Sequence, residues 1–557
     1  MNNSPSSSDP IDSSVIPIET ADKQQDMKDP QVSETVSIEM KTVVTAEMKE
    51  DALVNKNESL TPSTTRTTQK DSEKNIEQSQ KSNKGLERAK FLGSAPLVST
   101  VWKLTYPDFI AKIVTASFSF ADTIYISNLA GDTAEERSLA LGSVTISLPI
   151  EQALQMGLAL LFGSGFSSTL GRFLGAHNKN SAEQTLGNLY FLDILCGILY
   201  PLIIIPLLPY ILQLLGASEE AGTLEIGRQY IMIYSLGSIL TNFMIGNNNL
   251  IRAEGQSLYS ASTMIVGGVF NILLDPVFIA VLSLGVNGAA ICTLVGNLIS
   301  VLLGFAYYAS SKSVVKFHWN NLSPNCSIIK DGLSVGVSGF IMTASTSIVS
   351  IVFNRLMIHF SPYSPDSIQT TELVSVLGAL SKIYYFFFMP LLSLSHGILP
   401  ILAFCKGANI QQRFMNSLKV CLISAFIVSL ILLIIGESCA ELLAKLFSSS
   451  QTFIDTFSYS LRFMIMLSPL SSVFFSVLPA LQATKQGLFA GILAFCKNCF
   501  FLILYGILFC YCRGDYWGIF YAYPVSDITN CIISIIVYFV KRNTFVVSPI
   551  KKETHSS

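Results

Sequence analysis

The feature that most constrains this chain is a set of twelve apolar segments, each about long enough to cross a lipid bilayer as one helix. A span of about 20 apolar residues covers the hydrocarbon core of a membrane. Half of the 557 residues are hydrophobic and only 13% are charged, a composition typical of membrane proteins. The sequence therefore predicts an all-α polytopic membrane protein with twelve transmembrane helices. The predicted spans are residues 104–127, 139–165, 186–213, 228–250, 258–283, 288–309, 332–358, 373–401, 414–436, 455–481, 486–511 and 516–540.

The connections between these spans alternate in charge along the chain. Connections after even-numbered spans are basic, and connections after odd-numbered spans are acidic. Because Lys and Arg concentrate in cytoplasmic loops, both termini are predicted to be cytoplasmic in a multi-pass protein of the plasma membrane or an internal organelle membrane. The basic set is Arg172, Lys179, Arg252, Lys312, Lys316, Lys330, Lys406, Arg413, Lys485, Lys541 and Arg542; the acidic set is Asp132, Glu135, Glu136, Glu219, Glu220, Glu225, Asp366, Glu372, Glu437 and Glu441.

Residues 1–90 differ in composition from everything that follows. They are rich in Ser, Thr, Lys, Glu and Gln and have almost no aromatic residues. Such a segment cannot bury enough apolar surface to offset the entropy of ordering. It is predicted to be a disordered cytoplasmic tail, and no cleaved signal peptide is expected at Met1.

The longest polar interruption, residues 310–332, divides the spans into six and six. Sliding the halves by about 230 residues aligns GSGFSSTLGRFLGA (163–176) with SHGILPILAFCKGA (395–408). Because six is even, both halves enter the membrane from the same side, so a parallel repeat about an axis along the membrane normal is predicted. The expected domains are a six-helix bundle at 91–310, a cytoplasmic linker at 311–331, a second bundle at 332–540 and a cytoplasmic tail at 541–557.

Two aspartates remain inside apolar spans of the first half. Asp122 lies in SFSFADTIYIS and Asp275 in FNILLDPVF, although a charged group at membrane depth costs at least ~2.5 kcal/mol. Asn271 is one helical turn before Asp275, and Thr293 in the next span can add a hydroxyl. Pro276 removes an amide donor and loosens the helix beside the acid. This group is predicted to bind a coupling ion, H⁺ or Na⁺.

Other polar residues within the spans are interpreted more simply. Glu151 follows a helix-bending proline and is interpreted as a cavity residue that faces a central cleft, and Asp527 as one that lines a cavity in the second half. Lys497 is long enough to extend its ammonium group to the membrane interface. The sequence contains no metal-ligand cluster, phosphate-binding loop or nucleophile with a base. Hence no metal, cofactor, nucleic acid or enzymatic activity is expected.

Several motifs, taken in order, resemble the multidrug and toxin extrusion (MATE) family of the multidrug/oligosaccharidyl-lipid/polysaccharide flippase superfamily. The resemblance covers roughly residues 90 to 540. It implies a V-shaped, two-lobed antiporter that exports organic cations or other drug-like xenobiotics in exchange for H⁺ or Na⁺ by alternating access. Small amphipathic or cationic substrates and the bilayer are then the expected partners of a monomer. The motifs are LGSAP (92–96), ADTIYISNLAG, LPIEQALQMGLALLFGSGFSSTLGRFLGA, LIRAEG (250–255), NILLDP and LGVNGAA.

The resemblance also assigns site residues. Asp122 matches the family's first-span aspartate, Asn271 and Asp275 match its N-x-x-x-D pair, and Thr293 matches its sixth-span threonine. Asn248 in IGNNNL matches a fourth-span asparagine of the same network. One departure is that the early seventh span, GLSVGVSGFIMTAST, has no carboxylate, so a second cation site of that kind is not expected.

Two alternatives remain at this point. A flippase for lipid-linked oligosaccharides or polysaccharides shares the two-bundle plan, but its cleft would need several Arg or Lys at depth, and the sequence of the first half places almost none there. An intramembrane aspartyl protease also uses two buried aspartates. That class does not explain the six-plus-six symmetry, and its characteristic surroundings are missing around Asp122 and Asp275.

Overall fold

The computed structural model describes residues 91–545 except 132, 216, 218, 220, 221, 362–369 and 449. The predicted N-terminal tail, residues 546–557 and the loop residues Asp132, Glu220 and Asp366 lie outside this part of the chain. All regular secondary structure in the described part is helical, as the apolar spans predict.

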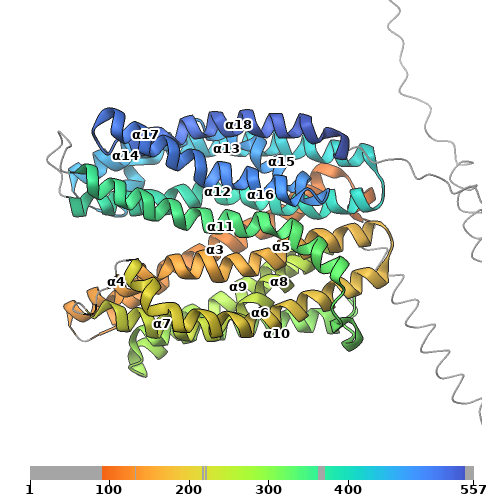
Figure 1. The fold of residues 1–557 in the computed structure, drawn as a ribbon, viewed down its shortest axis with the longest axis horizontal. Helices are drawn as coiled ribbons and strands as arrows, with labels where there is room; N and C mark the ends of the chain where they lie inside the picture. Colours follow the sequence, from red (N-terminus) through yellow and green to blue (C-terminus); the bar gives the residue numbers. More distant parts are fainter. Residues whose placement is uncertain are drawn as a thin grey trace, which may run out of the picture. The chain divides into compact units, whose positions relative to one another are not determined.

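The helices form two lobes, called here the first and the second lobe (Figure 1). The first lobe contains α3 (Leu97–Leu129), α4 (Ala134–Ile150), η1 (Glu151–Met156), α5 (Gly157–Gly175), α6 (Lys179–Leu214), α7 (Thr223–Leu236), α8 (Ser238–Ala253), α9 (Ser257–Pro276), η2 (Val277–Val281) and α10 (Gly285–Ala309). After η3 (Trp319–Leu322), the second lobe contains α11 (Cys326–Phe360), α12 (Thr370–Gly407), α13 (Gln411–Lys445), α14 (Gln451–Ile465), η5 (Ser468–Leu470), α15 (Ser471–Ala483), α16 (Gly487–Phe495), η6 (Cys496–Phe500), α17 (Phe501–Arg513) and α18 (Gly518–Phe545).

Eleven described segments are long and apolar enough to cross a membrane as helices. The predicted fourth span is instead divided into α7 and α8 at Gly237, and neither piece alone has the required length. Gly237 lies so close to α10 that a Cβ there would be 2.0 Å from a methyl carbon of Leu294. The twelve predicted spans are therefore all largely helical; the fourth is broken at Gly237, and the tenth is interrupted between α14 and α15.

Several helices extend beyond their predicted ends. α11 begins at Cys326, within the predicted linker, and α18 continues through Lys541 and Arg542, which were assigned to the C-terminal tail. A hydropathy pattern detects only the part of a helix that lies in hydrocarbon, whereas the backbone hydrogen bonds continue into the headgroup region. The domain boundaries drawn from hydropathy are therefore shorter than the helices themselves.

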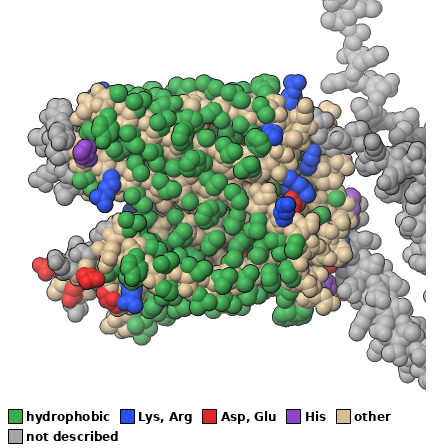
Figure 2. Space-filling model, viewed as in Figure 1, with side chains coloured by type: hydrophobic (Ala, Val, Ile, Leu, Met, Phe, Trp, Pro, Cys, Tyr) green, Lys and Arg blue, Asp and Glu red, His purple; other side chains and the backbone are tan. Residues whose placement is uncertain are grey.

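Hydrophobic side chains cover the middle of both lobes on the face shown in Figure 2, and charged side chains lie toward the ends. We call the end that contains the turns after α5, α8, α10, α12 and α15 the basic end, because these turns carry the basic set of the sequence. The opposite end contains the acidic connections. A continuous apolar band between charged ends is the surface that a bilayer requires.

The two lobes are in close contact near the basic end. α5 packs against α11 so closely that a Cβ on Gly165 would lie 2.0 Å from the carbonyl oxygen of Gly332. A Cβ on Gly175 would similarly lie 2.1 Å from the carbonyl oxygen of Phe404 in α12. Small residues allow helix backbones to approach in this way. The glycines of the α5 motif thus form the seam between the lobes.

Polar contacts recur at equivalent positions of the two lobes, offset by 230 residues. In the first lobe Asn297 donates to Thr241 (3.2 Å), and in the second lobe Ser471 donates to Asp527 (2.9 Å). The ion pair Arg252–Asp108 (2.8 Å) likewise corresponds to the hydrogen bond from Gln482 to Ser338 (2.8 Å). Shared contacts at one offset support the parallel repeat more strongly than the few aligned identities do.

A buried glutamate at the basic end, Glu254, holds the connection after α10 in place by hydrogen bonds. Glu254 lies outside the spans, in the turn between α8 and α9, and it accepts hydrogen bonds from Val314 N (2.7 Å), Tyr307 Oη (2.9 Å) and Ser313 Oγ (3.1 Å). Burial raises the pKa of the Glu254 carboxyl to about 7, although these donors oppose the rise. An acid whose pKa is higher in the folded protein than in the unfolded chain binds more protons when folded.

Stability should therefore fall as the pH rises from about 4.5 to about 7 and then level off, by a total on the order of 3 kcal/mol. Glu254→Gln should remove this part of the pH dependence. The measurement is the unfolding midpoint of the detergent-solubilised protein between pH 4.5 and 8. Glu183→Gln, at the same end, is the matched control and should keep the wild-type slope. Identical slopes for wild type and Glu254→Gln would contradict the prediction.

Candidate functional site

The two predicted aspartates meet inside the first lobe. Asp122 on α3 is half-buried, and Asp275 near the end of α9 is fully buried. α3 and α9 pack against each other, and the carboxyl groups of the two aspartates hydrogen-bond to each other. Such a bond needs a proton on one of the two groups, because two ionised carboxylates repel. The pair can therefore hold and release a positive ion.

Asn271 and Thr293 lie beside the pair, although the Thr293 contact differs from the expected one. In one orientation the Asn271 amide donates to Asp275 Oδ1 (3.5 Å); in the other it donates to Asp122 Oδ1 (3.2 Å) and accepts from Thr293 N (3.2 Å). The Thr293 hydroxyl donates to Ala289 O of its own helix (3.1 Å). Its oxygen can still accept a hydrogen bond or contact a cation.

The backbone beside Asp275 is irregular. α9 ends at Pro276 and continues directly as the π-helix η2, as expected where a proline removes a hydrogen bond. Among the described residues Asp275 Oδ2 has no hydrogen-bond partner. The Cys292 side chain lies close enough to interact with the same carboxyl group. A buried, unpaired carboxyl oxygen is costly and is available to an ion that enters the site.

Glu151 lies close to this pair and belongs to the same lobe. It is the first residue of the π-helix η1, it bonds to the Tyr234 hydroxyl, and its charge acts on Asp122. Tyr230 stacks on Tyr234, with ring centroids 6.3 Å apart. We call Asp122, Asp275, Glu151, Tyr230 and Tyr234 the acid chamber. Glu151 was predicted to face a central cleft, and the structure associates it with the acid chamber.

Asn248, which was also assigned to the ion site, makes its hydrogen bonds outside the acid chamber. Its amide donates to Ser260 O (2.8 Å), and its oxygen accepts from Arg252 (2.8 Å). Ser260 precedes Asp275 by 15 residues on α9, which corresponds to about 22 Å of helix. The three consecutive asparagines point in different directions, and this one faces the first turns of α9.

Asp527 was predicted to line a cavity of the second half, and the structure places it in a buried ion pair. It is buried and forms an ion pair with Lys497 (2.6 Å), and Ser471 donates to the same oxygen (2.9 Å). Lys497 therefore does not extend to the interface. Its ammonium group lies within the second lobe, 5.4 Å from the centre of the Phe388 ring.

The sequence reasoning missed a charged cluster between the lobes. Asp108 and Lys112 on α3, Arg252 at the end of α8 and His396 on α12 lie together there, all largely buried. Lys112 binds Asp108 and also donates to Ser393 of the second lobe (3.1 Å). The four-residue spacing of Asp108 and Lys112 was the available signal, because it is typical of an ion pair on one helix face. The first half thus carries a basic group, Lys112, within a predicted span, and a buried Arg252 next to it.

The acid chamber contains no basic neighbour among the described residues whose charge acts on its acids. No group of three or more His, Cys, Asp or Glu side chains in the described ranges could hold a metal ion. Two carboxyl groups, an amide and a hydroxyl oxygen fit a proton or a small monovalent cation. The arrangement is chemically suited to bind such an ion.

Comparisons with known proteins agree with this architecture. The MatE family model matches residues 107–277 and 339–508, one segment in each lobe and together more than half of the chain. The multidrug export protein MepA of Staphylococcus aureus (strain MSSA476) is 22% identical over 408 residues, which are 73% of this chain and 86% of MepA. MepA of Staphylococcus haemolyticus (strain JCSC1435) is 22% identical over 412 residues, 74% of this chain and 87% of that protein.

Solved structures show the same fold. A multidrug resistance MATE family transporter of the MOP superfamily, in an outward-facing conformation, matches with a TM-score of 0.72 at 22% identity, covering 83% of this chain and 99% of that one. A MOP superfamily transporter from Pyrococcus furiosus matches with a TM-score of 0.72 at 22% identity, covering 82% and 98%.

The helical spans, the two matched lobes and the multidrug export relatives together establish a multidrug efflux transporter, not an enzyme. This also excludes the aspartyl protease alternative, in which the two aspartates would have cleaved peptide bonds. The chain therefore belongs to the multidrug and toxin extrusion (MATE) family.

Proposed function

We propose that this protein is an antiporter that exports small amphipathic or cationic drug-like molecules in exchange for H⁺ or Na⁺ bound at Asp122 and Asp275. The observation that carries the proposal is the hydrogen-bonded pair of carboxyl groups, sheltered in one lobe with Asn271 beside it. Acids at membrane depth are expensive and mark ion pathways. Moving one charge through 100 mV releases about 2.3 kcal/mol, enough to support a modest substrate gradient.

The proposed cycle is alternating access between the two lobes. The basic end lies on the cytoplasmic side in this proposal, with both termini. The α5 seam, at Gly165 and Gly175, closes that side. Ion binding or release at the acid chamber changes the charge inside the first lobe and so favours one packing of the lobes over the other.

Transport into vesicles tests the coupling directly. Purified protein reconstituted into vesicles should move a fluorescent cationic dye such as ethidium when a pH gradient or a sodium gradient is imposed alone, and the effective gradient identifies the ion. Protein-free vesicles under the same gradients are the control. Dye movement that is insensitive to both gradients would contradict the proposal.

A second candidate is the flippase for lipid-linked saccharides. Buried Lys112 and Arg252 favour it, because such a cleft needs basic groups for pyrophosphate. The export relatives favour drug efflux. Translocation of a fluorescent lipid-linked sugar across the same vesicles, without any dye export, would favour the flippase.

A further inference from the structure

The cluster between the lobes combines more positive than negative charge. Lys112 binds Asp108 from one side, and Arg252 binds it from the other (2.8 Å). His396 of the second lobe lies 3.2 Å from the Lys112 ammonium nitrogen and 3.8 Å from the Asp108 carboxylate. With Lys112 and Arg252 both charged, a single carboxylate leaves one positive charge without a partner. An uncompensated charge away from water is strongly unfavourable.

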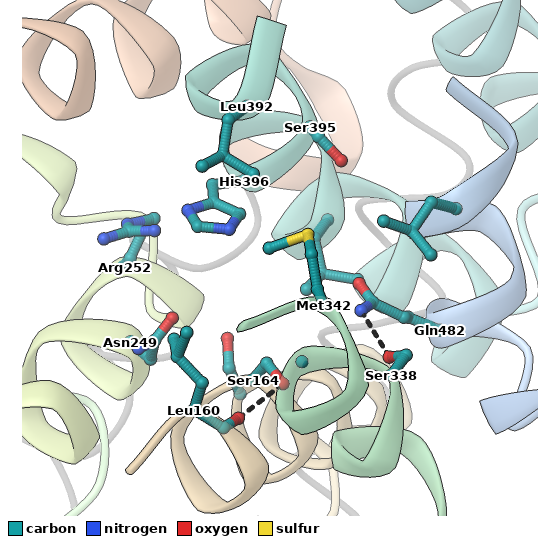
Figure 3. A pocket seen from close by; sticks show the side chains of 14 residues that line it. Leu160, Ser164, Asn249, Arg252, Ser338, Met342, Leu392, Ser395, His396 and Gln482 are labelled. Carbon is teal, nitrogen blue, oxygen red and sulfur yellow. Dashed lines mark hydrogen bonds between the residues drawn. The ribbon is translucent and has the colours of Figure 1, made fainter. Parts of the chain in front are cut away.

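A cavity between the lobes adjoins this cluster (Figure 3). It is lined from the first lobe by Ser164, Asn249 and Arg252 and from the second by Ser395 and His396, among others. Figure 3 shows Arg252 and His396 next to each other at one wall of this cavity. Its walls therefore belong to both lobes, and it must change shape when the lobes move apart.

Two N–H donors, one of Arg252 and one of His396, lie at this wall. Arg252 is 6% exposed, and its Nε has no hydrogen-bond partner among the described residues. His396 Nδ1 faces the ammonium group of Lys112 (3.2 Å) and must accept from it. A neutral imidazole that accepts at Nδ1 carries its hydrogen on Nε2. The wall thus presents an unpaired guanidinium N–H beside an imidazole N–H.

The equivalent position of the second lobe differs in charge. Gln482 and Ser338 occupy the sites that correspond to Arg252 and Asp108, and they also line the cavity. The positive charge is therefore confined to the first-lobe side. The repeat therefore does not account for this positive charge, and contact between the lobes does not require a charged residue here.

We propose that this cavity binds an anionic group between the lobes, held by Arg252 Nε and His396 Nε2. The group is a halide or carboxylate, present either as a free ion or as the charged end of a transported molecule. Resting on the proposed export function, the second source would extend the substrates to amphipathic carboxylates. The protein would then bind ions of opposite charge at two different places, a cation at the acid chamber and an anion between the lobes.

Anion-dependent stabilisation of the purified full-length protein tests the proposal. The unfolding midpoint is measured while sodium chloride or sodium benzoate replaces sodium HEPES at constant ionic strength. Wild type should show a saturable rise with at least one of the two salts. A response to chloride indicates a free ion; a response to benzoate alone indicates the charged end of a larger molecule.

Variants locate the effect. Arg252→Gln leaves one positive charge, on Lys112, opposite one negative charge, on Asp108. The apparent affinity for the anion should fall roughly tenfold or more, because a hydrogen bond to a charged group is lost. Asp108→Asn adds a further unpaired positive charge and should strengthen it. Arg172→Gln is the matched control, since Arg172 is a buried interface arginine paired with Asp331 (2.8 Å) and does not line the cavity. It should keep the wild-type response.

Absence of any response in wild type, or an equal response in Arg252→Gln, would overturn the inference. Asp275→Asn separates this inference from the proposed function. That variant should lose gradient-driven export and retain the anion response, because its carboxyl group belongs to the acid chamber. Normal export by Asp275→Asn with a retained anion response would contradict only the proposed function, whereas lost export without any anion response in wild type would contradict only this inference.

Discussion

Asp275→Asn is expected to abolish gradient-driven efflux of a cationic dye while leaving the protein folded and membrane-inserted. Asparagine has the size of aspartate, and Oδ2 of Asp275 makes no hydrogen bond that the substitution would break. The amide, however, carries no charge and cannot exchange a proton. The pair Asp122–Asp275 then loses the ion that couples the gradient to lobe movement. Efflux from dye-loaded vesicles under an imposed gradient is the measurement.

Asp122→Asn should also abolish gradient-driven efflux, because neither carboxyl group can form the shared site alone. Asp193→Asn provides a matched control, since Asp193 is a fully buried aspartate of the first lobe on α6, outside the acid chamber. It should retain coupled efflux. Normal efflux by Asp275→Asn would show that the acid pair does not carry the coupling ion.

Lys497→Met is expected to lower the free energy of unfolding by about 3–5 kcal/mol, the typical effect of removing one partner from a buried ion pair. Lys497 and Asp527 are 5% and 2% exposed, and the Lys497 ammonium also donates to Ser471 (2.8 Å). Methionine fills the same space, but it leaves the Asp527 carboxylate without a countercharge. The unfolding midpoint in detergent should fall markedly.

A double-variant cycle separates the pair from its packing. Asp527→Leu alone should lower the free energy of unfolding about as much as Lys497→Met, because it leaves the Lys497 ammonium group without a countercharge. The double variant, with two apolar side chains in contact, should recover most of the lost stability. Additive losses in the double variant would mean that the two residues act independently, against the 2.6 Å contact.

The acid pair was predictable because its signals are local. Asp122 and Asp275 interrupt apolar runs, and Asn271 is placed one turn before Asp275 on the same helix face. Thr293 was identified by its place in a motif, but the prediction gave the hydroxyl as the contact, whereas its backbone N–H meets Asn271. Which atom of a residue reaches a neighbour depends on helix rotation, and composition does not specify rotation.

Asn248 illustrates the same limit. Successive residues of a helix point about 100° apart, so at most one of three consecutive asparagines faces a given partner. Asn247 accepts from Tyr190 (2.7 Å), Asn248 binds Ser260, and Asn249 lines the cavity between the lobes. Tyr230 and Tyr234 of the acid chamber were not identified, although their four-residue spacing placed both on one face of the fourth span.

By itself the sequence determined the helical spans, their alternating loop charge, the repeat and the two acids of the first lobe. Each of these is a property of hydrophobicity or spacing within one segment. Only the tertiary structure decided that Lys497 meets Asp527 and that Arg252, Lys112 and His396 converge beside one cavity. These contacts join helices distant in the chain, and small helix rotations and the closeness of the glycine seam create or remove them.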